Sequence, residues 1–330
     1  MTSDSSAVGS SAVGSPAAAS ATPAVLPGPA RVRERLKTVV AVPVTPFTPA
    51  SDVDWDGHAL LIRRLVEHGV DIVTPNGNTG EFYALSAAEK RRAVESAVAA
   101  VDGRAEVVAG VGLDTAGAIG AARHAAASGA GAVMVHQPVH PYRSAAGWIE
   151  YHRVIADAVP ELGVVPYIRD ARVGGVQIAE LADACPNVVG VKYAVDDPVR
   201  FASVARDAGL HRFAWVAGLA ELAAPGYWAV GAAGFTSGLV NVAPRLSTAM
   251  LEALRGADFG KAMLLWEAIR EFEELRAADA SADNVSVVKE ALAQLGLVGR
   301  EVRPPSRILP QPVRDRIAVV LDRWRSGGWL

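Results

Sequence analysis

From about residue 38 onward, the chain alternates between short apolar runs and longer amphipathic segments. The short runs are apolar at successive positions, which is typical of strands buried on both faces of a parallel sheet. They cover residues 38–44, 70–74, 106–111, 132–136, 163–167, 188–192, 213–217 and 232–236. Strands that alternate with helical segments indicate repeated βαβ units, and eight such units close a (β/α)8 barrel.

The segments between the apolar runs have the spacing of amphipathic helices. Examples cover residues 87–101, 116–127, 148–158 and 198–207. The alternative arrangement of such units is an open, doubly wound sheet. That fold favours a glycine-rich phosphate loop after the first strand, where this chain has Val44-Thr45-Pro46-Phe47. We therefore expect an α/β fold of the (β/α)8, or TIM barrel, type, with its site at the carboxyl ends of the strands.

The composition divides the chain into three regions. Residues 1–30 are rich in Ala, Ser, Gly and Pro and lack the pattern of a secretory signal, so we expect a flexible tail. The barrel is expected over residues 31–255, and a C-terminal helical extension over residues 256–330. Helical spacing in this last part of the chain covers residues 244–255, 259–277, 284–295 and 311–325.

Charge, hydropathy and cysteine content exclude several classes of protein. The formal net charge of −3 and the absence of a basic stripe give no reason to expect nucleic acid. Arg31, Arg33 and Arg35 form a small cluster, but Glu34 interrupts it, which favours a solvated helix start. No segment reaches the roughly 18 apolar residues of a membrane span. The single cysteine, Cys185, excludes an internal disulfide and a Cys-based zinc site. We expect a cytoplasmic protein that acts on a small molecule.

Lys192 ends one of the predicted strands. Burial in such a run disfavours the ammonium form, lowers the pKa and leaves a neutral amine as a possible nucleophile. The alternative is a lysine at a strand end whose ammonium group reaches water. The other four lysines lie in polar, helical contexts and are expected on the surface: Lys37, Lys90, Lys261 and Lys289.

Polar residues follow several of the predicted strands. The loop from Gly77 to Glu81 offers backbone N–H groups and small polar side chains that suit a carboxylate or carbonyl oxygen, although a plain tight turn has the same composition. Tyr167 and Lys192 end neighbouring strands, so the phenol could shuttle protons for the amine; a buried tyrosine with a satisfied hydroxyl is the alternative. The candidate substrate-binding residues are Thr45, Asn78, Thr79, Arg169, Gly218 and Ser237.

His136 and His140 raise the possibility of a metal site. Their spacing suits a helix face, but Pro138 and Pro141 make a helix improbable there, and no carboxylate motif accompanies the pair. The sequence also contains no phosphate loop, nucleophile elbow or dinucleotide fingerprint. We therefore expect neither a metal nor a cofactor.

Several motifs occur together in an order that is similar to one known family. They are Val44-Thr45-Pro46-Phe47, Gly77-Asn78-Thr79-Gly80-Glu81-Phe82, Tyr167, Gly190-Val191-Lys192, Gly218 and Val302-Arg303-Pro304-Pro305. With them, residues 38–309 resemble the dihydrodipicolinate synthase / N-acetylneuraminate lyase family of class I, Schiff-base-forming barrels. The resemblance implies that Lys192 forms an imine with the C2 carbonyl of a 2-oxo acid and that Tyr167 relays protons. It further implies that Asn78 and Thr79 hold the substrate carboxylate, and that the protein is a homo-oligomer, dimer or tetramer.

Within this family, two segments depart from the synthases. Gln137-Pro138-Val139-His140 replaces Thr-Pro-Tyr-Tyr, with His140 near the place of a tyrosine that the synthases share between subunits. Tyr167-Ile168-Arg169-Asp170 replaces Tyr-Asn-x-Pro. This second segment and Gly80-Glu81-Phe82-Tyr83 look more like the 5-dehydro-4-deoxyglucarate dehydratases. However, Asn78 stands where that subgroup has glycine, and Tyr193 follows Lys192 where relatives carry an acidic residue, which suggests different acid–base surroundings for an imine.

We therefore predict a lyase that acts on a 2-oxo sugar acid through a Lys192 imine, most like a 5-dehydro-4-deoxyglucarate dehydratase. Arg169 is the candidate for a distal carboxylate, unless it forms a salt bridge with Asp170 or Glu81. One alternative is a pyruvate-dependent aldolase or a condensing enzyme of the dihydrodipicolinate synthase type. Another is a non-catalytic barrel that binds sugar acids.

Overall fold

Eight parallel strands form a closed barrel in the computed structural model, which describes residues 1–2 and 28–330. Each strand pairs with the next one along the chain, and β8 pairs with β1. The strands are β1 (Val39–Ala41), β2 (Ile72–Val73), β3 (Glu106–Val111), β4 (Ala132–Val135), β5 (Gly163–Ile168), β6 (Gly190–Tyr193), β7 (Ala214–Ala217) and β8 (Gly234–Ser237). The predicted (β/α)8 barrel is confirmed.

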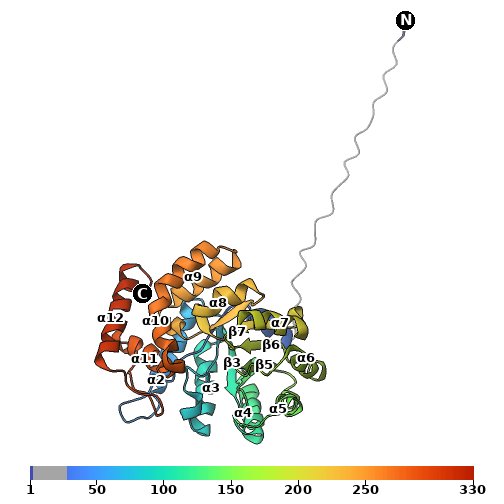
Figure 1. Ribbon diagram of the computed structural model, residues 1–330, viewed down its shortest axis with the longest axis horizontal. Coiled ribbons are helices and arrows are strands. Elements are labelled where there is room, and N and C mark those ends of the chain that lie inside the picture. Colours follow the sequence, from blue (N-terminus) through green and yellow to red (C-terminus); the bar gives the residue numbers. More distant parts are fainter. Residues whose placement is uncertain (3–27) are drawn as a thin grey trace.

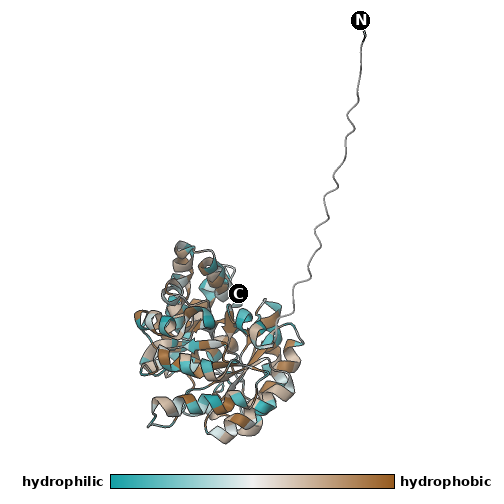
Figure 2. Cartoon of the chain, turned by 90° about the vertical axis from the view of Figure 1, so that its right-hand side faces the viewer, coloured by the Kyte–Doolittle hydropathy of each residue, from teal (hydrophilic) through white to brown (hydrophobic). Residues whose placement is uncertain are grey.

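The strands are apolar on both faces because each face packs against a different part of the core. In β4, Ala132 and Met134 belong to the cluster inside the barrel, whereas Val133 and Val135 belong to the larger cluster between strands and helices. This alternation follows from the period of two along a strand. In Figure 2 the central strands are mostly brown, while the surrounding helices mix brown and teal residues.

Helices surround the barrel (Figure 1) and supply its outer layer. Several begin at side-chain caps that satisfy free backbone N–H groups, such as the capping box of Ser86 and Glu89 at the start of α3. The helices that follow the first seven strands are α2 (Trp55–Glu67), α3 (Ala87–Val101), α4 (Thr115–Ser128), α5 (Ala145–Asp157), α6 (Gly175–Ala184), α7 (Pro198–Ala208) and α8 (Ala220–Ala229). Short 3-10 helices are η1 (Phe82–Ala84), η2 (Leu210–Arg212) and η3 (Leu239–Asn241).

An N-terminal helix, α1 (Gly28–Arg35), precedes the barrel. Its residue Val32, together with Leu36, joins the cluster inside the barrel, so this segment covers the end opposite the carboxyl ends of the strands. Arg31 and Arg35 both form ion pairs with Glu106 at the start of β3. The predicted helix start is therefore correct, but two of its three arginines bind the barrel and do not only contact solvent. The predicted tail falls mainly on residues 3–27, which lie outside the described residues.

Four helices follow the last strand and gather on one side of the barrel, coloured orange to red in Figure 1. They are α9 (Pro244–Arg255), α10 (Phe259–Ser281), α11 (Asn284–Gln294) and α12 (Gln311–Ser326). The backbone of α10 leaves helical geometry at Ala278, and Asp279 and Ala280 have positive φ angles. Across residues 28–330, no helix is both long enough and apolar enough to cross a bilayer.

Candidate active site

A cavity of about 620 Å³ opens at the carboxyl ends of the barrel strands. Its wall combines residues from β5 and β6 with loops after β2, β7 and β8 and with the C-terminal helices. Seven of the eight residues predicted for the site line this cavity: Asn78, Thr79, Tyr167, Arg169, Lys192, Gly218 and Ser237. The structure therefore brings together residues that lie up to 159 positions apart in the sequence (237 − 78).

Lys192 lies in β6, and its side chain points into the barrel. It is paired in register with Tyr167 of β5, and its Nζ lies 4.1 Å from the centroid of the Tyr167 ring. Only 5% of its surface is exposed. Burial lowers the pKa of Lys192 to about 7, and the positive charge of Arg169 acts in the same direction. A large fraction of the amine is thus neutral at neutral pH and able to attack a carbonyl carbon.

Tyr167 is held by one hydrogen bond to its hydroxyl. Asn78 Nδ2 donates to Tyr167 Oη at 3.2 Å, while Asn78 Oδ1 is buried without a partner among the described residues. Burial raises the pKa of Tyr167 to about 12, with Arg169 opposing the shift. The phenol is therefore protonated at neutral pH, next to the amine, and can donate to a substrate oxygen.

The loop after β2 is fixed from two sides. Thr45 is buried and its hydroxyl donates to the carbonyl of Gly80 at 2.8 Å, so it supports the loop from behind and does not line the cavity. Glu81 adopts a left-handed backbone conformation with φ of 57°, which is strained for a residue with a Cβ. Its carboxylate accepts from Nζ of Lys289 in α11 and from the backbone N–H of Arg303. The C-terminal extension thereby fixes the shape of the loop that contributes Asn78.

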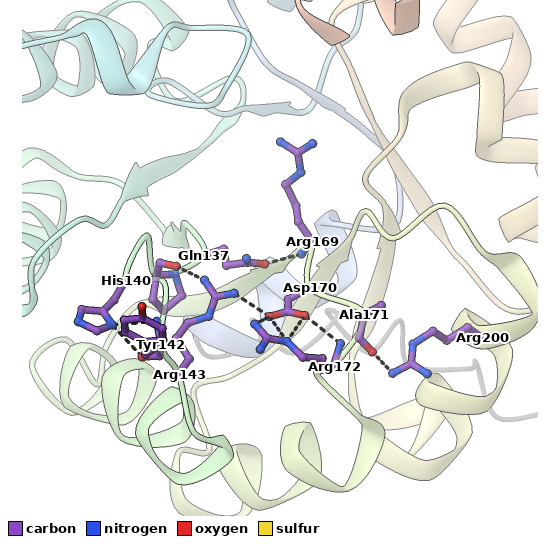
Figure 3. A network of polar contacts seen from close by, with 10 residues as sticks. Gln137, His140, Tyr142, Arg143, Arg169, Asp170, Ala171, Arg172 and Arg200 are labelled. Carbon is purple, nitrogen blue, oxygen red and sulfur yellow. Dashed lines mark hydrogen bonds and ion pairs between the residues drawn. The ribbon is translucent and has the colours of Figure 1, made fainter. Parts of the chain in front are cut away.

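Arg169 extends into the cavity without a carboxylate partner in the described part of the chain. Figure 3 shows its side chain pointing away from the neighbouring polar network. Asp170 instead pairs with Arg143 at 2.7 Å and with Arg172 at 2.6 Å. The alternative prediction, a salt bridge from Arg169 to Asp170 or Glu81, is wrong because both carboxylates are already occupied by other cations.

Gly218 follows β7 and Ser237 ends β8, and both lie at the cavity. A Cβ at Gly218 would lie 2.7 Å from Cβ of Ala194, so only glycine permits this approach of two neighbouring strand ends. The hydroxyl of Ser237 accepts from the N–H of Val240 at 2.8 Å and donates to Glu221 Oε1. The Ser237 hydroxyl therefore forms its hydrogen bonds mainly within the protein.

Tyr193, the residue after Lys192, lies on the other face of β6. Its ring packs against Phe201 and Tyr227 in the layer between barrel and helices, with ring centroids 5.4 Å and 6.5 Å away. Because Tyr193 stands where relatives carry an acidic residue, the sequence suggests that it alters the acid–base surroundings of Lys192. The structure shows that the Tyr193 side chain does not reach them, because successive strand residues point to opposite faces.

His136 and His140 do not act together. His136 is fully buried, stacks on Phe82 at 4.0 Å and forms a hydrogen bond with the carbonyl of Asn76. His140 is exposed and contacts the backbone of Tyr142. In residues 28–330, no group of three His, Cys, Asp or Glu side chains has the arrangement of a metal site.

Comparison with known proteins places the chain in a family. The family model described as the dihydrodipicolinate synthetase family matches residues 35–323. The chain belongs to the dihydrodipicolinate synthetase family. Proteins of this family are class I lyases and aldolases that form Schiff bases, and the chain is an enzyme of this class. A non-catalytic barrel, one of the alternatives from the sequence, is thereby excluded.

Relatives within the dihydrodipicolinate synthetase family carry two kinds of name. A 4-hydroxy-tetrahydrodipicolinate synthase from Phenylobacterium zucineum is 34% identical, with coverage of 87% of this chain and 96% of that protein. A protein from Azotobacter vinelandii named "Probable 5-dehydro-4-deoxyglucarate dehydratase" is 30% identical, covering 86% and 94%. The crystal structure of dihydrodipicolinate synthase from Bacillus clausii has a TM-score of 0.86 at 40% identity, covering 89% and 99%.

Three charged residues of the C-terminal helices lie at the cavity or at the loop after β2, and the sequence alone did not identify them. Lys289 was expected on the surface but is fully buried beside Glu81. Glu273 and Arg276 of α10 line the cavity and were not singled out. The only available signal was that these charges fall on the apolar stripe of their helices, and helix periodicity alone does not say which cavity a helix covers.

Proposed function

We propose that this enzyme forms an imine between Lys192 and the C2 carbonyl of a 2-oxo acid. The observation that supports this most strongly is the placement of a buried amine, with a pKa near 7, 4.1 Å from the ring centroid of Tyr167 at the floor of the cavity. Attack by Nζ on C2 gives a carbinolamine, and loss of water gives the iminium. Tyr167 supplies the proton that leaves with the carbonyl oxygen.

The iminium then acts as an electron sink. Loss of a proton from C3 places the electron pair in an enamine, and expulsion of hydroxide from C4, protonated as it leaves, gives the dehydrated iminium. When the substrate carries a carboxylate at C6, that group leaves as carbon dioxide and the electron pair of the C5–C6 bond moves into the conjugated iminium, which leaves an enol at C5. Protonation at C3 restores the iminium, the C5 enol becomes an aldehyde, and addition of water releases the 2-oxo product and regenerates the amine. The phenol of Tyr167 serves as both donor and acceptor in these proton transfers, because its pKa of about 12 keeps it protonated between them.

The cavity favours a substrate with a second carboxylate. Backbone and side-chain groups of Asn78 and Thr79 hold the C1 carboxylate in this proposal. Arg169, whose guanidinium has no carboxylate partner among the described residues, binds the carboxylate at the other end. These features fit 5-dehydro-4-deoxyglucarate, whose dehydration and decarboxylation give 2,5-dioxopentanoate. The relative from Azotobacter vinelandii that carries this activity in its name supports the same choice.

A pyruvate-dependent condensation or aldol reaction is the second candidate. It is supported by the relatives named 4-hydroxy-tetrahydrodipicolinate synthase. The same Lys192 enamine, formed on pyruvate, attacks an aldehyde in that reaction and expels no hydroxide. Against it, residues 137–140 lack the tyrosine that the synthase pattern carries at this place.

Reductive trapping tests the imine. The protein is incubated with pyruvate or with 5-dehydro-4-deoxyglucarate, reduced with borohydride, and the adduct is located by peptide mass spectrometry. We expect the label on the peptide that contains Lys192, none in Lys192→Ala, and an unchanged label in the matched control Lys261→Ala, which alters an exposed lysine of α10. A label elsewhere, or one that persists in Lys192→Ala, contradicts the proposal.

Product analysis separates the two candidate reactions. Release of carbon dioxide from 5-dehydro-4-deoxyglucarate supports the dehydratase. Consumption of pyruvate together with an aldehyde, without release of carbon dioxide from the sugar acid, supports the aldolase or synthase.

A further inference from the structure

Two charged residues of α10, Glu273 and Arg276, form part of the cavity wall. Each side chain is only 4% exposed, and Arg276 Nη1 donates to Glu273 Oε1 at 2.5 Å. They belong to the C-terminal extension, yet they face the same cavity as Lys192 and Arg169. The proposed reaction assigns them no role.

The guanidinium of Arg276 is placed at the end of β8. A Cβ on Gly238 would clash with Nη2 of Arg276, so the absence of a side chain at this strand end makes room for the group. Arg276 Nη2 donates to Asn284 Oδ1 at 3.2 Å, whereas Nε is buried without a partner in the described part of the chain. An unpartnered buried donor next to a cavity is a position at which a ligand oxygen can bind.

The charges on this wall differ from those around Arg169. The Arg276 cation is already neutralised by Glu273, so the pair presents a donor and an acceptor side by side and little net charge. A further carboxylate, that of Glu221, accepts a hydrogen bond from Ser237. The pKa of Glu221 is raised, mainly because the group is buried and secondly because of the negative charge of Glu273. Because Arg276 is already surrounded by carboxylates, it is poorly suited to bind a substrate carboxylate as well. A buried ion pair is also, by itself, weak evidence for a role in stability.

We propose that Glu273 and Arg276 bind hydroxyl groups of the substrate chain and select a polyhydroxylated 2-oxo acid. A hydroxyl donates one hydrogen bond and accepts others, so it matches a carboxylate next to a guanidinium N–H. This inference rests on the proposed imine chemistry of Lys192. It divides recognition between two walls: Arg169 binds charge, and the α10 pair binds hydroxyl groups.

A matched pair of ligands tests this division. 5-Dehydro-4-deoxyglucarate and 2-oxoadipate have the same chain length and both carboxylates, and they differ in two hydroxyl groups. Half-saturation of reductive trapping on Lys192 is measured for each in the intact protein. We expect half-saturation at an about tenfold or more lower concentration for the hydroxylated acid, in line with hydrogen bonds to charged groups. Equal half-saturation in the unaltered protein overturns the inference.

Variants of the pair locate the effect. In Glu273→Gln and in Arg276→Lys, the ratio of the two half-saturation concentrations is expected to fall toward one. The exposed neighbour Glu274→Gln serves as the control and is expected to keep the ratio of the unaltered protein. If a single variant does not fold, Glu273→Gln/Arg276→Gln replaces both charges at once and avoids a lone buried ion. An unchanged ratio in the folded variants contradicts the inference.

The proposed function fails in a different way. If neither acid, nor pyruvate, labels Lys192 in the unaltered protein, the imine chemistry is wrong. If all three label Lys192 but the two six-carbon acids saturate alike, the imine stands and only the role of the α10 pair is lost.

Discussion

The amine of Lys192 is buried, with the cation of Arg169 as its main charged neighbour. Because its pKa is lowered to about 7, the rate of imine formation should rise with pH through neutrality and level off above it. One unit below that pKa, only about a tenth of the amine is neutral, so the rate should fall about tenfold per pH unit. The measurement is the rate constant of trapping with pyruvate and cyanoborohydride from about pH 5.5 to 8.5.

A variant of Arg169 tests whether Lys192 is the group whose titration sets this pH dependence. Replacing the arginine in Arg169→Gln removes a positive charge that favours the neutral amine, so the pKa of Lys192 should rise and the profile should move to higher pH. A profile that stays in place, or moves to lower pH, contradicts the assignment of the titration to Lys192.

Tyr167 relays protons in the proposed reaction but does not itself bind the substrate covalently. We therefore expect Tyr167→Phe to slow turnover by about 10²- to 10⁴-fold, the range typical of general acid–base groups. Reductive labelling of Lys192 should still occur, more slowly. Tyr83→Phe, which alters a half-exposed tyrosine beside the same loop, should leave turnover nearly unchanged. Equal losses in the two variants would point to a general disturbance of the loop.

Single residues could be predicted where strand geometry decides their direction. Tyr167 and Lys192 were predicted to face each other because adjacent strands end together, and the structure confirms this pairing. The same alternation places Tyr193 on the opposite face, although its neighbouring position suggested a role beside the amine. The roles of Lys289 and Arg276 were beyond prediction, because Glu81, the partner of Lys289, lies 208 positions away and the cavity that Arg276 lines exists only in the closed barrel.

The loop after β2 and helix α11 are joined by the buried ion pair of Glu81 and Lys289. Burial lowers the pKa of Lys289 to about 8 although Glu81 acts to raise it, and Nζ also donates to the carbonyl of Glu301 at 2.8 Å. Lys289→Met leaves the Glu81 carboxylate buried without its cation. We expect this variant to lower the free energy of unfolding by about 3–5 kcal/mol, measured by urea denaturation. Reductive labelling of Lys192 should also be weaker, because the loop after β2 is displaced.

Two further variants identify the cause of such a loss. Lys261→Met removes an exposed lysine and should change the free energy of unfolding by no more than about 0.5 kcal/mol. Glu81→Gln/Lys289→Met removes both charges and should recover much of the loss, because no lone buried ion remains. If the double variant is as unstable as Lys289→Met, the lone buried carboxylate is not the cause of the loss.

Helices and strands were predictable to the extent that their pattern is local. The periodicity predicts residues 87–101 and 244–255 as helices, and α3 and α9 have these bounds. In α10 the helical geometry ends after Ala277, as predicted, and a kink with positive φ angles follows. By contrast, the run predicted over residues 38–44 yields only a short β1, because Val42 and later residues turn into the loops that build the site.

The barrel and its C-terminal helices share one hydrophobic core. Phe272 of α10, Leu292 of α11 and Trp324 of α12 belong to the same buried cluster as the residues between the strands and α2 to α9. We therefore expect residues 31–255 and 256–330 to unfold in one cooperative transition, although the sequence pattern separates them. Far-UV circular dichroism and tryptophan fluorescence should give coincident urea transitions.

A substitution in the last helix tests this cooperativity. Trp324 is 2% exposed, so Trp324→Ala should lower the stability by about 3–5 kcal/mol and move the transitions of both probes together. Val319→Ala changes an exposed position of the same helix and should leave both transitions within about 0.5 kcal/mol. If Trp324→Ala instead creates a separate early transition in which Lys192 can still be trapped with pyruvate, the extension is an independent unit. Its contacts through Lys289 and Arg276 would then be unnecessary for imine formation.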